Sequence, residues 1–353
     1  MSRQVKELDY TGKTIHVGID THLKSWKEAI ALEHSLQKVF SQEANPEQLV
    51  KHLKRHYPNG EYICVYEAGF CGFWIQESLE KQGISCKVVN AADVPTSNKD
   101  KQQKTDRRDC RKLAKSLRGG LLEFINIPPK QLQLDRSIVR TRYKIKRDVN
   151  RVKNRIVSHL HFYGIEEENK ERRSWTKKYI KWLEQIQIEK SDSALGLLLL
   201  ELTQMREIEL AALKQIRKLS RTDRYKSDVE LLITTPGIAM LTSMRLLVEI
   251  GDIKRFKKLD NLCGMVGLVP NTHASGEKEG VGEMTKRGRK ELRTALIESS
   301  WVAISKDTEL ALCYEEYRKR MKPTEAIVRI AKKLLNRIRR VLITKEAYQM
   351  ATA

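Results

Sequence analysis

The first part of the chain alternates between short apolar runs and longer amphipathic stretches. Three runs rich in β-branched and aromatic residues predict buried strands: 14–20, 62–67 and 85–91. Two further segments have the pattern of a hairpin, 26–33 and 36–42. Two stretches have the apolar period of amphipathic helices, 46–56 and 72–81. This order of elements predicts an α/β layer architecture with a mixed sheet.

A long helical pattern follows the pair Pro128-Pro129, which marks a boundary. Apolar residues then recur at spacings of 7, 4, 3 and 4, which is typical of a coiled-coil seam: Ile138, Ile145, Val149, Val152 and Ile156. A second helix is predicted from about Ser193 to Leu219, and its apolar stripe passes through Glu209, so the seam is imperfect. An ordinary helical hairpin used for packing or dimerisation would explain both stripes.

The last part of the chain is predicted to be mainly α-helical. The run 231–238 contains Pro236-Gly237 and precedes a helical pattern at 241–249, an order that resembles a helix-hairpin-helix. In that motif the turn presents backbone amides to a phosphate, although Pro-Gly between two helices is also a common turn. Residues 267–276 read as a glycine-rich loop. These changes of pattern divide the chain into three segments, 1–128, 129–225 and 226–353.

The composition adds a strong positive charge. The 353 residues include 67 Lys and Arg against 45 Asp and Glu, a net charge of +22, so the expected partner is a polyanion. Nine basic residues and one acid lie between Arg136 and Arg155, and a hairpin used only for packing does not explain this one-sided charge. We therefore expect a helical arm that pairs with a partner and also lies along nucleic acid. Its expected contacts are Arg140, Lys144, Arg147 and Arg151.

Cysteine usage and hydropathy indicate the compartment. The six cysteines form no C-x-x-C pair and mostly lie in apolar surroundings, which argues against structural zinc and against a disulfide framework. No apolar run approaches the roughly 20 residues of a membrane span, and the N-terminus has no signal-peptide core. We expect a soluble protein of a reducing cytoplasm with no membrane partner.

Four acids are the most informative polar residues. Asp20 and Glu67 each end a predicted strand. Asp106 and Asp109 lie three apart where a helix over 109–117 is predicted, so both face one side of it. Carboxylates placed in this way can hold Mg²⁺ or Mn²⁺, and two such ions about 3.5–4 Å apart clamp a phosphodiester. Single acids would be explained as helix caps or strand ends, whereas four in this order favour a metal site.

A second group of candidate residues lies near the C-terminus. Ser275 stands between Ala274 and Gly276, before a basic cluster of Lys286, Arg287, Arg289, Lys290 and Arg293. A serine beside guanidinium groups can attack a phosphodiester while the cations stabilise the charge at phosphorus. Composition alone favours the simpler alternative, in which Ser275 is one loop serine among many and the cluster only grips phosphate. The sequence places no histidine as its base, although His273 is near.

The two groups, in this order, resemble the DEDD transposases of the insertion sequence one-ten family. That family includes the Piv-type invertases and the bridge-RNA-guided recombinases. The first block of the resemblance is the four acids followed by the basic coiled coil. The second is the Pro-Gly element followed by Gly267-Leu268-Val269-Pro270, Ser275-Gly276, Thr285-Lys286-Arg287-Gly288 and Leu292-Arg293. The resemblance spans nearly the whole chain.

The resemblance implies a fold and a set of site residues. It implies a RuvC-like domain of the RNase H fold at 1–128, a coiled-coil insertion at 129–225 and a C-terminal transposase domain at 226–353. It places the four acids at the metal-binding positions: Asp20, Glu67, Asp106 and Asp109. Ser275 takes the position of the serine nucleophile. Family members often carry two serines before that glycine, and here the first is Ala274.

The resemblance also implies partners and a mechanism. It implies a covalent phosphoserine link to DNA, a structured bridge RNA that pairs with target and donor DNA, and a dimer or tetramer that joins acids and serine across subunits. The setting would be a bacterial or archaeal cytoplasm, close to the nucleoid. Two other hypotheses remain open. One is a RuvC-like junction nuclease that activates water; the other is a non-catalytic nucleic-acid-binding scaffold, which the presence of all four acids argues against.

Overall fold

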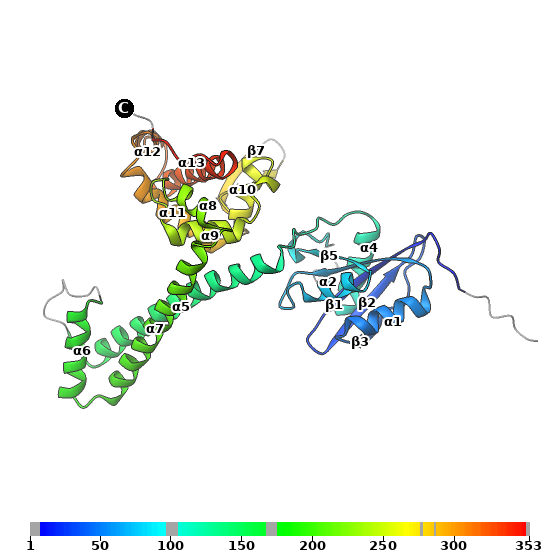
Figure 1. Ribbon diagram of the computed structural model, residues 1–353, viewed down its shortest axis with the longest axis horizontal. Helices are drawn as coiled ribbons and strands as arrows, with labels where there is room; N and C mark the ends of the chain where they lie inside the picture. Colours follow the sequence, from blue (N-terminus) through cyan, green and yellow to red (C-terminus); the bar gives the residue numbers. More distant parts are fainter. Residues whose placement is uncertain (1–7, 97–104, 167–174, 276–277, 286, 351–353) are drawn as a thin grey trace, which may run out of the picture. The chain divides into compact units, whose positions relative to one another are not determined.

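The computed structural model describes residues 8–96, 105–166, 175–275, 278–285 and 287–350, and for 272–283 it describes the backbone alone (Figure 1). The chain divides into two compact units, Met1–Ile127 and Pro128–Ala353. Each unit has its own buried apolar core. None of the helices in the described ranges is both long and apolar enough to cross a membrane.

The first unit is built on a mixed five-stranded sheet with the strand order β3-β2-β1-β4-β5. Strand β1 pairs antiparallel with β2 and parallel with β4, while β2–β3 is antiparallel and β4–β5 parallel. The strands are β1 Thr14–Thr21, β2 Ser25–Ala31, β3 Phe40–Glu43, β4 Glu61–Glu67 and β5 Ser85–Val89. The predicted α/β architecture is therefore present, and it is consistent with an RNase H-like domain.

Helices cover both faces of this sheet. Helices α1 (Pro46–His56) and α2 (Trp74–Lys81) pack their apolar residues with Ile15, Val17 and Ile19 of β1. Helix α4 (Asp106–Arg118) packs on the other face through Cys110, Leu113 and Ala114.

Glycine 18 determines how closely α4 approaches the sheet. A Cβ at this position would lie 2.2 Å from the carbonyl oxygen of Cys110 and 2.4 Å from the backbone nitrogen of Ala114. Only a glycine allows this contact, because both neighbouring atoms belong to the helix backbone and cannot move aside. The close approach brings the first turn of α4 toward the end of β1, two residues beyond Gly18.

Several predicted boundaries differ from the structure. The second hairpin strand begins at Phe40 and not at Leu36, which forms only an isolated bridge with Ala31. Helix α4 begins at Asp106, one turn before the predicted residue 109, so both acids lie in its first turn. The first turn contains only polar residues, so the pattern of apolar positions could not identify it as helical.

One buried acid in this unit lacks a hydrogen-bond partner. Glu28 of β2 is fully buried, and neither carboxylate oxygen accepts a hydrogen bond from any described residue. Burial raises the pKa of Glu28 from 4.5 to about 8. Below pH 4.5 the carboxyl is neutral in the folded and unfolded states, and from there to about pH 8 only the unfolded state loses the proton. The free energy of unfolding therefore falls by up to about 1.4 kcal/mol per pH unit across this window.

We expect Glu28→Met to stabilise the first unit in a pH-dependent way, because Met fills a similar volume without an ionisable group. The gain in unfolding free energy should be about 3 kcal/mol larger at pH 7.5 than at pH 5.5. Hydrogen exchange of the β1 and β2 amides measures this for the first unit alone. The exposed Glu33→Met serves as control. An equal gain for Glu28→Met at both pH values would contradict the assignment.

The second unit begins with a helical arm. Helices α5 (Lys130–Phe162) and α7 (Ser193–Ser220) lie side by side, with α6 (Lys177–Glu189) packed against α7 (Figure 1). The ion pairs Arg142–Glu209 and Arg155–Glu201 show that α5 and α7 run antiparallel. The two predicted helices are confirmed. Trp175 and Trp182 pack against the core of the arm.

The predicted seam is correct along the arm and wrong at its base. Ile145, Val149, Val152 and Ile156 belong to the core of the arm, but Ile138 packs into the core of the C-terminal helices. Glu209, which interrupts the stripe of α7, pairs with Arg142 at 2.8 Å and with Lys146 at 3.9 Å. The base of the arm and the C-terminal helices therefore share one core.

The rest of the second unit is mainly helical. Its helices are α8 Lys226–Leu232, α9 Met240–Ile250, α10 Leu259–Val266, α11 Lys290–Ile304, α12 Thr308–Arg318 and α13 Pro323–Thr344. The Pro-Gly turn joins α8 to α9 as predicted. A Cβ at Gly237 would lie 2.2 Å from the carbonyl oxygen of Ser299, so this side of the turn packs against α11. That contact leaves this side closed to a phosphate.

The predicted glycine-rich loop was wrong, because the segment is a β-hairpin. Strands β6 (Pro270–Ser275) and β7 (Lys278–Met284) pair antiparallel, with a register shift between Pro270 and Thr272. Glycine and polar residues dominate these strands, so they lack the apolar alternation that identifies a strand in sequence. The cross-strand backbone hydrogen bonds define the hairpin instead.

Candidate metal and nucleic-acid sites

The four predicted acids come from three elements at one edge of the sheet. Asp20 lies at the end of β1, and Glu67 ends β4, its parallel neighbour. The ends of parallel strands meet at the same edge, so these carboxylates share it. Asp106 and Asp109 approach from the first turn of α4, which Gly18 allows to cross β1 closely.

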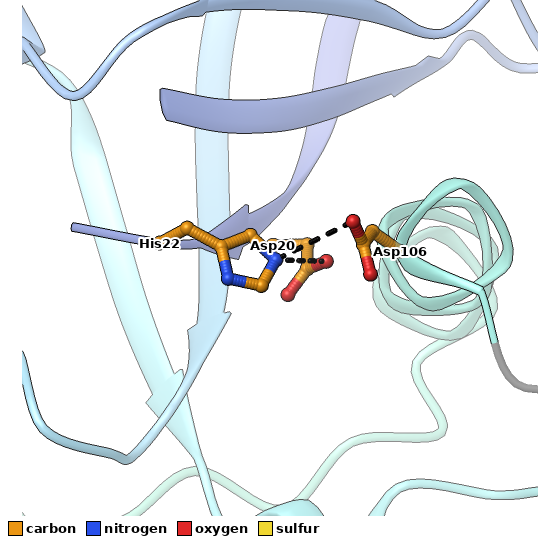
Figure 2. Close-up of side chains that lie close together, drawn as sticks. All are labelled: Asp20, His22 and Asp106. Carbon is orange, nitrogen blue, oxygen red and sulfur yellow. Dashed lines mark ion pairs between the residues drawn. The ribbon is translucent and has the colours of Figure 1, made fainter. Parts of the chain in front are cut away.

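A histidine that the sequence did not single out lies within ion-pair distance of two of these acids (Figure 2). The Nε2 atom of His22 is 3.3 Å from Oδ2 of Asp20 and 3.6 Å from Oδ2 of Asp106. One ligand atom from each of the three residues lies within 4.8 Å of the others. The available signal was the spacing, because residues two apart on a strand project from the same face.

Two lysines also contact the acids. The Lys27 ammonium is 2.6 Å from Oδ2 of Asp106. Lys112 lies 3.3 Å from Oδ1 of Asp109 and 4.0 Å from Oε1 of Glu67, and so links these two acids. Neither lysine was predicted from the sequence. Lys27 is brought to the site by the pairing of β2 with β1, which places it opposite Asp20.

Burial and neighbouring charges shift the pKa values of two of these acids. Burial raises the pKa of Asp20, and the negative charges of Asp106 and Asp109 raise it further against the opposing effect of His22. The hydrogen bond from Lys27 lowers the pKa of Asp106. A cation placed among these groups would relieve the mutual repulsion of the acids, as Lys27 and Lys112 do in part.

The donor set fits a divalent cation. Carboxylate oxygens are the ligands that Mg²⁺ and Mn²⁺ prefer, and an imidazole nitrogen is a common further ligand for transition metals. Asp20, His22 and Asp106 are close enough to share one ion. Glu67 and Asp109 are linked to each other by Lys112, at the same edge of the sheet.

Ser275 lies in the second unit, at the end of β6. Its backbone pairs with Lys278, the first residue of β7. Its side chain, like that of His273, lies outside the described atoms, and Gly276 and Lys286 lie outside the described residues.

The base of this hairpin is held by the backbone and by Arg293. The Arg293 guanidinium donates hydrogen bonds to the carbonyl oxygens of Gly267, at 3.1 Å, and Thr285, at 2.7 Å. A Cβ at Gly267 would lie 2.5 Å from the carbonyl oxygen of Arg287. Arg293, expected to bind nucleic acid, thus positions the strand that carries Ser275.

The other expected nucleic-acid contacts fall into two groups. Four of them, from segments far apart in the sequence, line one cavity of about 270 Å³: Arg140, Lys144, Arg147 and Arg289. Arg151 lies further along α5, exposed and paired with Asp148 at 2.5 Å. Arg287 is exposed near the start of α11. The structure therefore joins the arm and the cluster before α11 into one basic surface.

Two family models and several curated proteins are similar to this chain. A transposase model named for the DEDD transposases of IS110 matches residues 17–165. A second, described as Transposase IS116/IS110/IS902 family, matches residues 229–315. The first range contains the four acids, and the second contains Ser275 and the basic cluster.

Several of the curated relatives match over most of the chain. A protein named as transposase y4qE, from Sinorhizobium fredii, is 27% identical over 293 residues, covering 81% of this chain and 70% of its own. The transposase for insertion sequence element IS1533 of Leptospira borgpetersenii is 26% identical over 260 residues, covering 69% and 71%. The transposase for IS1111A of Coxiella burnetii is 24% identical over 242 residues, covering 67% and 64%.

Proposed function

The chain belongs to the IS110 family of DEDD insertion-sequence transposases, and we propose that it cuts and rejoins DNA with metal-binding acids and a serine nucleophile. The observation that carries the proposal is the convergence of four acids from β1, β4 and α4 at one sheet edge. These acids lie within the segment matched by the DEDD transposase model. Transposases of this family act on DNA, so donor and target DNA are the substrates.

The acids would hold one or two Mg²⁺ or Mn²⁺ ions. Asp20, His22 and Asp106 supply the tightest group of ligand atoms, and Glu67 and Asp109 extend it. When bound, such ions neutralise the scissile phosphate and lower the pKa of the attacking hydroxyl. Lys27 and Lys112 offset the repulsion among the acids and keep their oxygens turned toward one another.

Ser275 would make the covalent link to DNA. Its hydroxyl oxygen bonds to phosphorus, the DNA oxygen leaves, and the serine proton is lost to a base. Attack by a DNA hydroxyl on the resulting phosphoserine restores the diester, so the exchange conserves bond energy and needs no ATP. The two hydrogen bonds of Arg293 at the base of the hairpin support this role of Ser275, because a nucleophile requires a fixed position.

We also propose a bridge RNA and a homo-oligomer, either a dimer or a tetramer. The net charge of +22 and the basic face of α5 support binding of more than one nucleic-acid strand. An RNA of one discrete length that co-purifies with the protein would support the guided mechanism. Purified protein that recombines DNA at full rate after ribonuclease treatment would contradict it.

The metal site leads to a binding prediction. We expect His22→Ala to weaken Mn²⁺ binding by about tenfold, because one ligand is lost, and to weaken Mg²⁺ binding less. Asp106→Asn should weaken both metals strongly. Calorimetric titration measures these affinities without any reaction, and the exposed Glu123→Gln is the control. Unchanged Mn²⁺ affinity in His22→Ala would exclude the imidazole as a ligand.

The arm leads to a salt-dependence prediction. Lys144, Arg147 and Arg151 are exposed at spacings of 3 and 4, so they follow one face of α5. Replacing Arg147 and Arg151 with Gln should lower the slope of log affinity against log salt by about 0.9 for each lost phosphate contact on duplex DNA. Arg140 is left in place because it neutralises the buried Glu249.

A matched control for the arm uses α6 and the residue that follows it. Replacing Lys181 and Lys190 with Gln removes the same charge from exposed positions and should leave the slope unchanged. If both pairs lowered the slope equally, the binding would depend on net charge and not on the face of α5.

A further inference from the structure

We propose that the cavity at the base of the arm is a pocket for one unpaired nucleotide of an RNA or DNA strand. The proposal rests on the proposed function in one respect, which is that the protein handles nucleic acid. The cavity lies where α5 meets α9 and the first turn of α11. Its volume of about 270 Å³ is near the lower bound of small-ligand pockets, roughly 300 Å³, so it suits one nucleotide and not a base pair.

The floor of this nucleotide pocket is apolar and fixed. Val139 and Leu292 line it, and both are buried in the core of the second unit. Beside them, the buried carboxylate of Glu249 accepts two hydrogen bonds from Arg140, at 2.6 and 2.7 Å. Burial alone would raise the pKa of Glu249, but the hydrogen bonds and charge of Arg140, with Arg289 and Arg136, lower it overall. Glu249 therefore stays ionised and holds the Arg140 guanidinium in place beside the pocket.

The residues that line the pocket carry more positive charge than its two carboxylates neutralise. Of the described residues, five cations and two carboxylates line the pocket. Among the described residues, no carboxylate lies within ion-pair distance of Lys144, Arg147 or Arg245. Within the described part of the chain, the Arg245 guanidinium donates one hydrogen bond, to the carbonyl oxygen of Glu291 at 3.4 Å. A half-buried guanidinium without a carboxylate partner favours an anion, and a phosphate matches its paired donors.

The N-terminus of α11 adds to this preference. Arg289 stands at the N-cap position without a capping hydrogen bond from its side chain, and Glu291 and Leu292 of the first turn line the pocket. The helix is 15 residues long, so its first turn presents positive partial charge to the pocket.

An aromatic side chain distinguishes a nucleotide pocket from a simple phosphate contact. The Arg245 guanidinium lies over the Tyr143 ring, 4.7 Å from its centroid, and both residues line the pocket. A guanidinium and an aromatic ring beside an apolar floor are suited to a base, because every base has an apolar face that stacks on aromatic rings and guanidinium planes. In a duplex, the bases already stack and pair with one another, so a concave pocket reaches only their phosphates.

The test compares the binding of single-stranded and duplex nucleic acids in the absence of metal. Binding of labelled single-stranded RNA, single-stranded DNA and duplex DNA is measured for the wild-type protein, Tyr143→Leu and Arg245→Gln. Tyr143→Leu should weaken single-strand binding by about tenfold at an unchanged salt slope and leave duplex binding unaltered. Arg245→Gln should weaken single-strand binding and also lower its salt slope by about 0.7. The exposed Tyr163→Leu at the end of α5 is the matched control.

A second measurement needs no variant. A single strand that carries a photoreactive 5-iodouracil should crosslink to the peptide containing Tyr143, and the RNA or DNA that crosslinks more identifies the source of the nucleotide. Equal loss of duplex and single-strand affinity in Tyr143→Leu, or crosslinks confined to other peptides, would overturn the proposal. Because no metal is present, an error in the metal or serine assignment does not affect the result. If the wild-type protein bound none of the three nucleic acids, the result would instead count against the proposed function.

Discussion

The variant Asp20→Asn is expected to lose DNA cleavage and strand exchange by at least about a thousandfold. Asn keeps the shape of the side chain and removes the negative charge at the end of β1. The remaining ligands, His22 and Asp106, would then hold a divalent cation with one charge fewer, so both metal affinity and phosphate neutralisation fall. The measurement is strand exchange on a supercoiled plasmid that carries the element's ends.

Two comparisons make this result specific. Asp223→Asn, at an exposed position between α7 and α8, should retain full activity. Nucleic-acid binding by Asp20→Asn should stay near normal, since the basic surface belongs to the second unit. The double variant with Asp106→Asn should be no worse than either single variant, because residues of one catalytic unit do not act additively. Full strand exchange by Asp20→Asn would exclude the acids as the metal site.

The sequence predicted the first unit well because its elements follow simple periods. Buried strands gave apolar runs, helix α1 gave a 3.6-residue period with the predicted bounds Pro46–His56, and the acids stood at the strand ends. A strand end is a fixed point of a parallel sheet, so Asp20 and Glu67 could be placed together from order alone.

The missed residues depend on contacts between distant segments. Lys27 reaches Asp106 because β2 folds back on β1 while α4 crosses Gly18, and no local pattern encodes that meeting. Arg140 looked like a free cation of a basic helix, but its partner Glu249 lies 109 positions away. A helix rich in arginine therefore shows where positive charge lies and not which of its residues are neutralised within the fold.

The prediction of a loop at 267–276 was wrong for a different reason. Residues 270–284 of the hairpin carry little apolar signal, so the pattern indicated a loop where backbone pairing forms two strands. The consequence for the candidate nucleophile is favourable, because Ser275 at the end of a paired strand is better positioned than a serine in a free loop. A nucleophile must be held within a fraction of an ångström of its reactive position.

The second large effect concerns this serine. Ser275→Ala is expected to abolish both strand exchange and the formation of a protein–DNA adduct that survives denaturant. Nucleic-acid binding should remain near normal, since one hydroxyl contributes little to contacts spread over many phosphates. Ser275→Cys should retain a trace of activity, because a thiolate attacks phosphorus less readily than an alkoxide. Denaturing gel electrophoresis of the trapped reaction detects the adduct, and peptide mass identifies the modified residue.

The controls separate three mechanisms. A junction nuclease that activates water predicts no adduct in the wild-type protein and cleavage by Ser275→Ala close to the wild-type rate. A serine recombinase with a different nucleophile predicts an adduct on another peptide, for example at Ser243 or Ser97. Ser305→Ala, at an exposed helix end, should behave as wild type. Because Asp20→Asn should also lose the adduct while Ser275 is intact, equal loss in both variants would indicate that acids and serine act in one step. An adduct that persists in Asp20→Asn would mean that the serine attacks without them.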